Sequence, residues 1–163
     1  MNQAINFFWT ILCFIPVIIF WIFTDTAPYC YIFLLISILF QLVPLKVLQL
    51  SNNPAFYERL GVKFIRKFVQ NGQYINSYLR HKNPGYRVVK HKKGASKYIK
   101  AAVMYERYHL ICFVCFLLTA AYALALNLIW FFLLISLANI IYNICPILLQ
   151  QYNKARINRI LKM

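Results

Sequence analysis

Acidic residues are scarce in this sequence of 163 residues, and charged residues of either sign are few. The only acidic residues are Asp25, Glu58 and Glu106, and charged residues make up 13% of the chain, whereas apolar residues make up 62%. The mean hydropathy of +0.60 is too high for a soluble domain of this length. The composition therefore excludes a soluble globular domain and indicates an integral membrane protein.

Four apolar runs are long enough to cross a membrane, since a helix needs about 20 apolar residues to span roughly 30 Å of hydrocarbon. The runs cover about residues 4–23, 29–50, 108–126 and 128–149. Asp25 in the first pair of runs and Asn127 in the second mark short turns. The predicted fold is an all-α integral membrane protein, a single membrane domain over residues 1–163, with four transmembrane helices arranged as two hairpins.

Lys and Arg are missing from the two short turns, although the sequence contains 18 of them. They lie at Lys46, between Arg59 and Arg107, and in a basic tail at residues 150–163. Because short loops rich in Lys and Arg stay on the cytoplasmic side, we expect the central loop, about residues 51–107, and the C-terminus to be cytoplasmic. With four spans the N-terminus is cytoplasmic too, in a multi-pass protein of the cell inner membrane.

The net charge of +15 has two interpretations that the sequence leaves open. Basic residues near the surface set the topology and attract anionic membrane lipids, each contributing about 1 kcal/mol. Part of the basic surface could instead contact the phosphates of an acyl donor. We expect no nucleic-acid partner, because the basic loop is attached to the bilayer and resembles no recognition module.

Metal and cofactor signals are weak. Cys112 and Cys115 have metal-like spacing, but no second pair or histidine partner lies nearby on the chain, and a thiolate ligand in lipid is costly. Haem is not expected either, because His109 is the only histidine near an apolar run. We therefore predict no metal and no bound cofactor.

The beginning of the central loop has clear sequence signals for a helix. Asn53 is a good cap, Pro54 fits the first helical position, and Gly72 is a plausible end. Large apolar residues recur every four positions, at Phe56, Leu60, Phe64 and Phe68. This pattern is typical of an amphipathic helix that lies in the membrane interface.

The fourth run carries carboxamides on one helix face. At about 100° per residue, four of them fall within an arc of roughly 80°. They are Asn139, Asn143, Gln150 and Asn153. Such residues often join membrane helices, with an average contribution of about 0.6 kcal/mol, and Asn139 alone fits that explanation. The set of four, continuous with Tyr152 and Arg156, predicts a polar groove that opens toward the cytoplasm.

Glu106 and His109 lie one helical turn apart at the start of the third run and so share a helix face. Antiparallel packing of the third and fourth helices brings them level with the carboxamides. Histidine is suited to removing a proton from a hydroxyl near neutral pH, and a carboxylate can orient the imidazole. Alternatively, Glu106 pairs with Arg107 or Lys100 and His109 is a polar anchor at the interface. Spacing alone does not separate these interpretations.

Several motifs resemble the glycosyl-4,4'-diaponeurosporenoate acyltransferase family over roughly residues 53–160. They are Phe56-Tyr57-Glu58-Arg59, Glu106-x-x-His109 and Asn143-x-x-Pro146-Ile147-x-x-Gln150-x-Tyr152-Asn153-x-x-Arg156. The resemblance implies a small membrane protein of the staphyloxanthin pathway that places a fatty acyl chain on the 6-hydroxyl of a carotenoid-linked glucose. It also implies importance for Glu106, His109 and the polar residues and proline of the last motif.

The sequence departs from the family pattern at three positions. Cys145 stands where the family tends to have Tyr, Gln151 where a basic residue is usual, and Lys154 where Arg is found. The change from Arg to Lys keeps the charge but loses the planar donor fork. The resemblance therefore implies acyl transfer to a lipid-linked hydroxyl more firmly than it implies a carotenoid acceptor.

Together, these features predict a membrane acyltransferase at the cytoplasmic leaflet. The donor is an acyl-CoA or acyl-carrier-protein thioester, and the acceptor is a hydroxyl of a glycosylated lipid or carotenoid. His109 is the expected base and Glu106 orients it. The expected substrate-binding residues are Asn139, Asn143, Gln150, Tyr152, Asn153 and Arg156.

Two other function classes stay open at this point. The chain could be a non-catalytic lipid-binding subunit of a larger membrane complex, because aromatic-rich spans with few deep charges suit contacts with membrane protein partners. It could also be a lipid or quinone carrier. The carrier interpretation fits less well, because the polar residues gather toward one leaflet.

Overall fold

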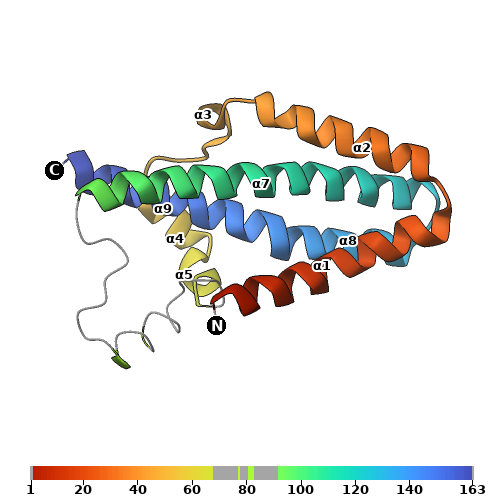
Figure 1. Cartoon of the computed structure of the whole chain (residues 1–163), viewed down its shortest axis with the longest axis horizontal. Helices are drawn as coiled ribbons and strands as arrows, with labels where there is room; N and C mark the ends of the chain where they lie inside the picture. The colour runs from red at the N-terminus through yellow and green to blue at the C-terminus, as the bar shows by residue number, and fades with distance from the viewer. Residues whose placement is uncertain (1, 68–76, 78–80, 83–91, 163) are drawn as a thin grey trace.

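The computed structural model describes residues 2–67, 77, 81–82 and 92–162, and every long element among them is helical (Figure 1). The elements are α1 (Asn2–Thr24), α2 (Ala27–Leu39), η1 (Phe40–Leu42), α3 (Leu45–Leu48), α4 (Pro54–Arg59), α5 (Val62–Ile65), α7 (Lys92–Ala125), α8 (Ile129–Asn139), η2 (Ile140–Ile144) and α9 (Cys145–Lys162). The predicted all-α class is confirmed for this part of the chain.

Three helical stretches are long and apolar enough to cross a membrane. They are Ala4–Thr24, Ala95–Ala125 and Ile129–Arg159, whereas the apolar stretch Ala27–Leu42 is shorter. The first, third and fourth predicted spans thus correspond to sufficiently long helices. The count of four spans stays a prediction, because the helix expected at residues 29–50 is shorter in the structure.

The second apolar run leaves the helix before its predicted end. Val43 has an extended backbone with ψ 126°, since Pro44 disfavours the helical conformation in the residue before it. The chain resumes as the short helix α3 and is extended again at Gln49. The predicted continuous helix over residues 29–50 is therefore wrong beyond Leu42. One consequence is that backbone groups of residues 48–51 have no helical partner and can hydrogen-bond to side chains of α9.

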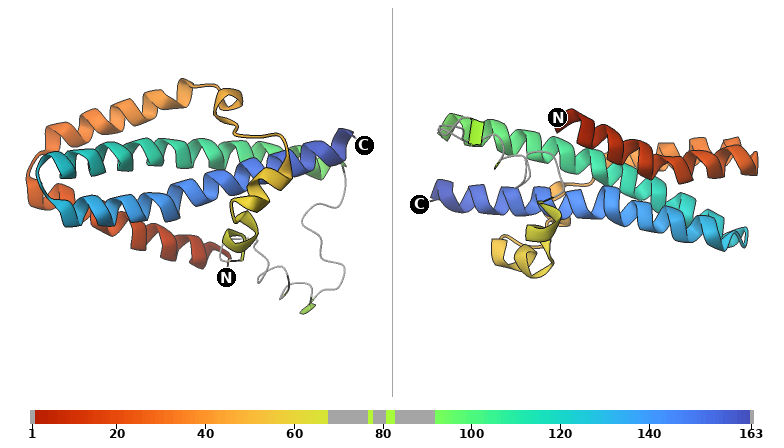
Figure 2. Two further views of the ribbon diagram at one scale, coloured as in Figure 1. Left: turned by 180° about the vertical axis from the view of Figure 1, so that it is seen from behind. Right: turned by 90° about the horizontal axis from the view of Figure 1, so that it is seen from below.

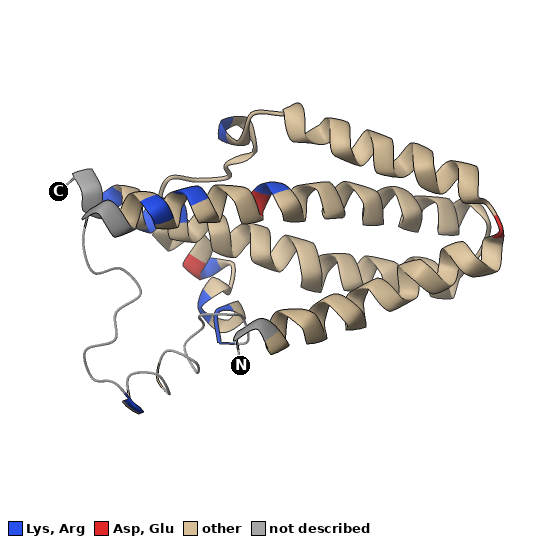
Figure 3. Ribbon diagram, in the orientation of Figure 1, with Lys and Arg blue, Asp and Glu red and all other residues tan. Residues whose placement is uncertain are grey.

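The two predicted turns are present. Asp25 and Asn127 have positive φ values of 46° and 59°, a conformation that Asp and Asn tolerate better than most residues. Both connections lie at the same end of the bundle, and Lys and Arg gather toward the other end (Figures 1 and 3). The structure thus has the two hairpins that the sequence predicts.

Helices extend into both the predicted central loop and the basic tail. Helix α7 begins at Lys92 and contains 34 residues, so residues 92–107 of the loop are helical. Helix α9 continues to Lys162, so most of the basic tail is helical as well. Hydropathy identifies only the apolar part of each helix. The helix itself continues beyond that part through residues with high helix propensity, such as Ala101 and Ala102.

The helix predicted to begin at Asn53 is broken into two. The Asn53 side chain accepts a hydrogen bond from the Ala55 N–H at 3.0 Å, which confirms the cap. Helix α4 ends at Arg59, and Gly61 adopts φ 80° before α5 begins. Gly72 and Phe68 lie outside the described residues. Because Gly61 interrupts the helix between α4 and α5, this segment is not the single amphipathic helix that was predicted.

The segment α4–α5 docks against α9 (Figure 2). Tyr57 and Val62 are fully buried and pack with Leu149, Tyr152 and Ala155 of α9. The apolar stripe predicted to face the interface, which includes Phe56, Leu60 and Phe64, is exposed.

A separate apolar core joins α1, α7 and α8. Phe20, Phe116 and Ile135 are almost completely buried in it. Ala120 and Ala123 of α7 are equally buried, and such small residues let membrane helices approach closely. Large apolar side chains elsewhere on α1, α2 and α8 are exposed, as expected for surfaces that face lipid.

Candidate functional site

The register of the fourth helical stretch is changed by a π-helical segment. Pro146 has no N–H for the carbonyl of Tyr142, four residues earlier, and its ring would crowd that carbonyl in a regular α-helix. The chain accommodates the proline with η2 just before it. Because a π-bulge adds one residue to the turn, it rotates all following residues by about 100° relative to a continuous α-helix.

This rotation corrects the predicted carboxamide face. Asn139 and Asn143 are buried, as expected. Beyond the bulge, however, Gln151 is 1% exposed and faces α7, whereas Gln150 is partly exposed. Lys154, three residues after Gln151, follows on the same side. The single arc of Asn139, Asn143, Gln150 and Asn153 is therefore wrong after Asn143.

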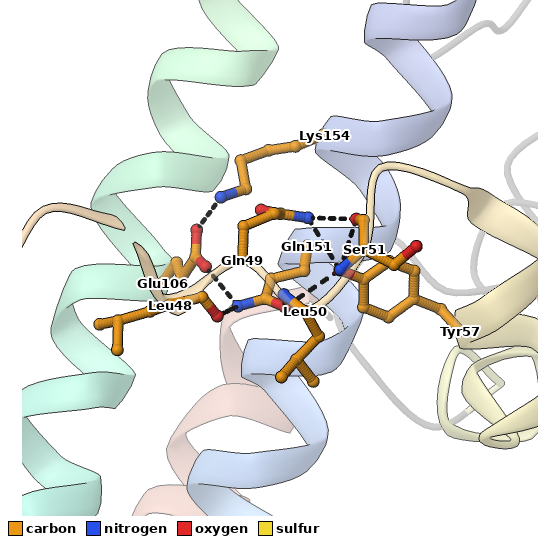
Figure 4. Close-up of polar contacts among 8 residues, drawn as sticks. All are labelled: Leu48, Gln49, Leu50, Ser51, Tyr57, Glu106, Gln151 and Lys154. Atoms are coloured by element: carbon orange, nitrogen blue, oxygen red, sulfur yellow. Dashed lines mark hydrogen bonds and ion pairs between the residues drawn. The ribbon is translucent and has the colours of Figure 1, made fainter. Parts of the chain in front are cut away.

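Gln151 is the centre of a buried polar cluster (Figure 4). Its Nε2 donates to Glu106 Oε1 and to the Leu48 carbonyl, each at 2.9 Å. Its Oε1 accepts from the Leu50 N–H at 3.2 Å and lies 3.1 Å from the Tyr57 hydroxyl. One side chain of α9 thus ties together α7, the segment before α4, and α4 itself.

Tyr57 completes this cluster from α4. Its hydroxyl accepts hydrogen bonds from the Ser51 N–H and from Gln49 Nε2 at 2.9 and 2.8 Å. Burial raises the pKa of Tyr57 above its ordinary value, so the hydroxyl stays protonated and its hydrogen is available to Ser51 O or Gln151 Oε1. We call Tyr57, Glu106, Gln151 and Lys154 the Gln151 cluster.

Glu106 is completely buried, and both of its carboxylate oxygens have partners. Oε1 accepts from Gln151, and Oε2 forms an ion pair with Lys154. The pairing with Arg107 considered from the sequence is not made, because Arg107 donates to the carbonyl of Gln41. A buried ion pair costs desolvation energy unless hydrogen bonds supplement it, and Gln151 provides one.

His109 faces a different part of the bundle. Its ring lies 5.2 Å from the Tyr108 ring and 5.3 Å from the Tyr142 ring, measured between centroids. The side chain of Asn143 and the backbone of Tyr142 are its polar neighbours. Nδ1 of His109 and Oδ1 of Asn143 are nevertheless both buried without an aligned hydrogen-bond partner among the described residues. We call these two residues the His109–Asn143 pair.

No hydrogen bond joins Glu106 to His109 in the described part of the chain, so the structure does not bring the two expected catalytic residues into direct contact. Asn139 fixes the position of the His109–Asn143 pair instead. Its Oδ1 accepts from Asn143 Nδ2 at 2.8 Å, and its Nδ2 donates to the Phe113 carbonyl on α7 at 3.2 Å. Asn139 therefore joins two helices, which was the alternative interpretation of this residue.

A chain of hydroxyl groups continues from the His109–Asn143 pair toward α1. The Tyr142 hydroxyl lies 3.1 Å from that of Tyr108 and 2.9 Å from that of Thr10. These contacts hold Tyr142 against the His109 ring. Sequence reasoning did not find them, because Thr10 is far from Tyr142 in the chain.

The other predicted binding residues lie on the α4–α5 side of α9. The Tyr152 hydroxyl donates to Glu58 Oε1 at 3.2 Å, and Arg156 is exposed above the Tyr152 ring. Gln150 and Asn153 make no hydrogen bond to another described side chain; Gln150 is partly exposed and Asn153 is buried.

Sequence reasoning missed the buried polar contacts that join Tyr57, Gln151 and Lys154 to their neighbours. Gln151 and Lys154 were noticed only as departures from the family motif. The detectable signal was Pro146, because a proline inside a membrane helix predicts a local break in the helical register. Among the described residues, no three His, Cys, Asp or Glu side chains come together as a metal site.

Comparison with protein families identifies the relationship. The family model of glycosyl-4,4'-diaponeurosporenoate acyltransferase (CrtO) matches residues 45–163, more than half of the chain. The chain belongs to this family. The resemblance recognised in the motifs is thereby confirmed. No curated protein and no solved structure gives a significant match.

The matched range also shows which part of the molecule is shared with the CrtO family. It begins at the start of α3 and includes α4, α7, α8 and α9, but not α1 or α2. The Gln151 cluster and the His109–Asn143 pair both lie within it, whereas Thr10 does not. The family name describes an acyltransferase, and the apolar helices indicate a membrane protein.

Proposed function

We propose that this protein transfers a fatty acyl group from a thioester donor to a hydroxyl of a glycosylated lipid or carotenoid at the cytoplasmic leaflet. The donor is an acyl-CoA or an acyl-carrier-protein thioester. One observation carries the proposal beyond family membership: His109 Nδ1 and Asn143 Oδ1 are both buried without an aligned hydrogen bond, and the two side chains are neighbours within an apolar bundle. Buried polar groups without partners are rare and are enriched at functional sites.

His109 acts as the general base in this proposal. Its Nδ1–H donates to Asn143 Oδ1 when substrate binds, since catalytic hydrogen bonds are often poorly aligned in the free enzyme and tighten in the complex. Nε2 then accepts the proton of the acceptor hydroxyl. An amide can orient a catalytic imidazole, as an Asn does in papain-like proteases. Asn143 thus takes the orienting role that the sequence suggested for Glu106.

The reaction itself is an acyl substitution. The hydroxyl oxygen attacks the thioester carbonyl carbon while His109 removes the hydroxyl proton, and the new C–O ester bond forms. The C–S bond then breaks, and the imidazolium returns the proton to the thiolate of the leaving group. No oxidant, reductant or metal is needed for this balance.

The remaining residues bind and position the reactants. Glu106 holds Gln151 and Lys154 in place and so fixes α9 against α7 and α4. Gln150, which is partly exposed, and Asn153, which is largely buried, are the carboxamides assigned to the sugar of the acceptor. Arg156, which is exposed beside Tyr152, contacts the phosphates of the donor together with basic residues of the central loop.

The test is acyl transfer by the purified protein in lipid nanodiscs, with long-chain acyl-CoA or acyl-carrier-protein donors and glycosylated lipid acceptors. We expect His109→Ala to lower the transfer rate by about 10²–10⁴, the usual contribution of a general base. Tyr105→Ala is the matched control, because Tyr105 is an exposed residue on the same helix. Full activity in a folded His109→Ala protein contradicts the assignment of the base.

A second arm separates the enzyme from the non-catalytic subunit. If neither donor supports transfer to any glycosylated acceptor and the wild-type protein co-purifies in fixed stoichiometry with other membrane proteins, the acyltransferase proposal is wrong. Product formation that depends on His109 supports it.

A further inference from the structure

The side chain of Tyr142 in η2 contacts α1 at two points. Its ring meets the Phe14 ring edge to face, at 5.3 Å between centroids and 89°, and it stacks on Phe116 of α7 at 6.4 Å and 13°. Its hydroxyl reaches Thr10, which lies four residues before Phe14 and therefore on the same face of α1. Only 7% of Tyr142 is exposed. Helix α1 thus holds both the ring and the hydroxyl of this residue.

The hydrogen bonds of the hydroxyl chain have a definite direction. Thr10 Oγ1 donates to the carbonyl of Asn6 at 2.8 Å, and a hydroxyl group carries only one hydrogen. Tyr142 therefore donates to Thr10 across their 2.9 Å contact. Since its own hydrogen is used, the Tyr142 hydroxyl accepts from Tyr108 at 3.1 Å. The hydrogen bonds run in one direction, from Tyr108 through Tyr142 and Thr10 to the backbone of α1.

This direction excludes one role for the two tyrosines. In this arrangement, the hydroxyl hydrogens of Tyr108 and Tyr142 are both used within the chain, so neither tyrosine donates a proton to a substrate or to His109. The chain instead fixes the Tyr142 ring, whose centroid lies 5.3 Å from that of His109 at an interplanar angle of 69°. Asn143, the next residue of η2, neighbours the same imidazole. The position of η2 at Tyr142 therefore constrains both neighbours of His109.

The imidazole of His109 depends on such packing for its orientation. Its Nδ1 is buried without an aligned hydrogen bond among the described residues, so aromatic contacts have to hold the ring. They come from Tyr108, its neighbour on α7, and from Tyr142. Orientation is important for a base, because a displacement of about 1 Å can lower a rate about 10²-fold.

We propose that Thr10 of α1 is a positioning residue for the site of His109 and acts through Tyr142. The inference rests on the proposed function, because the orientation of His109 affects a rate only if His109 removes a proton. It extends the site to α1, which lies outside the range of residues 45–163 that the family model matches. Thr10 contacts no reactant in this proposal, so its loss should change kcat rather than KM.

The position of Tyr142 is measured first, without an assay of activity. 3-Fluorotyrosine is incorporated in place of Tyr142 in the full-length protein, and ¹⁹F NMR spectra are recorded in detergent micelles. We expect Thr10→Val, which replaces the hydroxyl by a methyl group, to shift or broaden the resonance, whereas Thr10→Ser keeps it close to that of the wild type. Thr24→Val is the matched control, because Thr24 lies at the other end of α1 and also donates to the carbonyl four residues earlier, that of Phe20.

The second measurement is the steady-state rate of acyl transfer by the same variants. Thr10→Val should lower kcat by about three- to tenfold with KM nearly unchanged, the effect of one lost neutral hydrogen bond. Thr10→Ser should recover most of this loss because it keeps the hydroxyl, and Thr24→Val should match the wild type. Tyr142→Phe removes the partner hydroxyl. If the two groups act through one contact, the double variant Thr10→Val/Tyr142→Phe should lose no more than the larger single loss.

The outcomes separate this inference from the proposed function. A resonance that moves in Thr10→Val and returns in Thr10→Ser supports the positioning of Tyr142 by Thr10. If the wild type nevertheless transfers no acyl group, the proposed function alone fails. An unchanged resonance in Thr10→Val overturns the inference at any rate, because Thr10 then does not act through Tyr142.

Two kinetic results also overturn the inference in an active enzyme. One is a wild-type kcat in Thr10→Val despite a moved resonance, since the contact then serves packing alone. The other is a Thr10→Ser variant as slow as Thr10→Val, because the hydroxyl is then not the group that matters. If Thr10→Val does not fold, Tyr142→Phe replaces it. A lowered kcat with unchanged KM in Tyr142→Phe supports the inference, and a wild-type kcat overturns it.

Discussion

The Gln151 cluster and the His109–Asn143 pair lie one helical turn apart on α7, yet they differ in how their polar atoms are used. In the Gln151 cluster, Glu106 Oε1 and both polar atoms of Gln151 have hydrogen-bond partners, and Glu106 Oε2, which has no aligned hydrogen bond, is neutralised by the ion pair with Lys154. In the pair, Nδ1 and Oδ1 are buried without aligned hydrogen bonds. A fully paired buried network stabilises a unique packing, whereas unpaired buried groups cost energy and stay available to a ligand.

This comparison predicts that substitutions in the two regions affect different measurements. Changes in the Gln151 cluster should lower the free energy of unfolding, and activity should fall mainly through loss of folded protein. Changes in the His109–Asn143 pair should lower activity in a protein that remains stable.

The largest expected effect on stability is that of Glu106→Leu. It leaves the Lys154 ammonium buried without its ion-pair partner, and breaking a buried pair in this way typically costs about 3–5 kcal/mol. The free energy of unfolding should be measured by titration with denaturing detergent. The double variant Glu106→Leu/Lys154→Met is the control and should recover most of the loss, since it removes both charges. An equally unstable double variant contradicts this explanation.

A smaller loss is expected for Gln151→Leu. The substitution leaves Glu106 Oε1 without its donor, and one unpaired buried polar group costs about 1–3 kcal/mol. The hydrogen bonds to the Leu48 carbonyl and the Leu50 N–H are lost too, but these are only part-buried and add less. Gln150→Leu is the matched control on the adjacent, partly exposed position, and its free energy of unfolding should stay close to that of the wild type. If Gln150→Leu is the more destabilising variant, the register assigned to α9 is wrong.

Asn143→Ala and Asn139→Ala sharpen the comparison, because both remove the hydrogen bond between the two side chains, and Asn139→Ala also removes the bond to the Phe113 carbonyl. The Phe113 bond joins two helices, so Asn139→Ala should be the more destabilising variant, by about 0.6 kcal/mol, the average for bonds between membrane helices. Only Asn143 neighbours His109, so Asn143→Ala should lower kcat by a larger factor than Asn139→Ala. Steady-state rates at equal amounts of folded protein provide the measurement. Equal rates in the two variants argue against Asn143 as the orienting residue.

The smallest effect concerns the docking of α4 and α5. The hydrogen bond from Lys63, at 2.7 Å, holds the pKa of Glu58 below its ordinary value. A carboxylate with a lowered pKa stabilises the folded state above its ordinary pKa of about 4.5, and this contribution is lost as the pH falls through the lowered value. Hydrogen exchange of α4 and α5, measured relative to the intrinsic exchange rate at each pH, should therefore accelerate in acid.

Glu58→Gln is the control for this pH dependence, because it removes the titrating group. The acceleration should be small and should shrink further in high salt, since Lys63 is largely exposed and such pairs are screened. The same acceleration in Glu58→Gln excludes Glu58 as its source.

Some local features were predictable from the sequence, whereas others depend on where a helix is interrupted. The turns at Asp25 and Asn127 and the cap at Asn53 were predictable, because each depends on a few neighbouring residues. The helix predicted to continue to residue 50 failed at Val43, where Pro44 acts on the residue before it. The polar face predicted on the fourth stretch includes Asn139 and Asn143 and then Gln150, whereas the structure continues that face with Gln151. Periodicity assumes an unbroken helix, and η2 breaks it.

The sequence by itself determined the helical class, the apolar character, the hairpin turns and the family, because these follow from composition, local propensity and motif spacing. Only the tertiary structure decided which partners the polar residues have. Glu106 pairs with Lys154 and Gln151, and His109 faces Asn143 and Tyr142. The physical reason is that one extra residue in η2, which accommodates Pro146, rotates everything after it, and only the packing against α7 and α4 decides which side chains then meet.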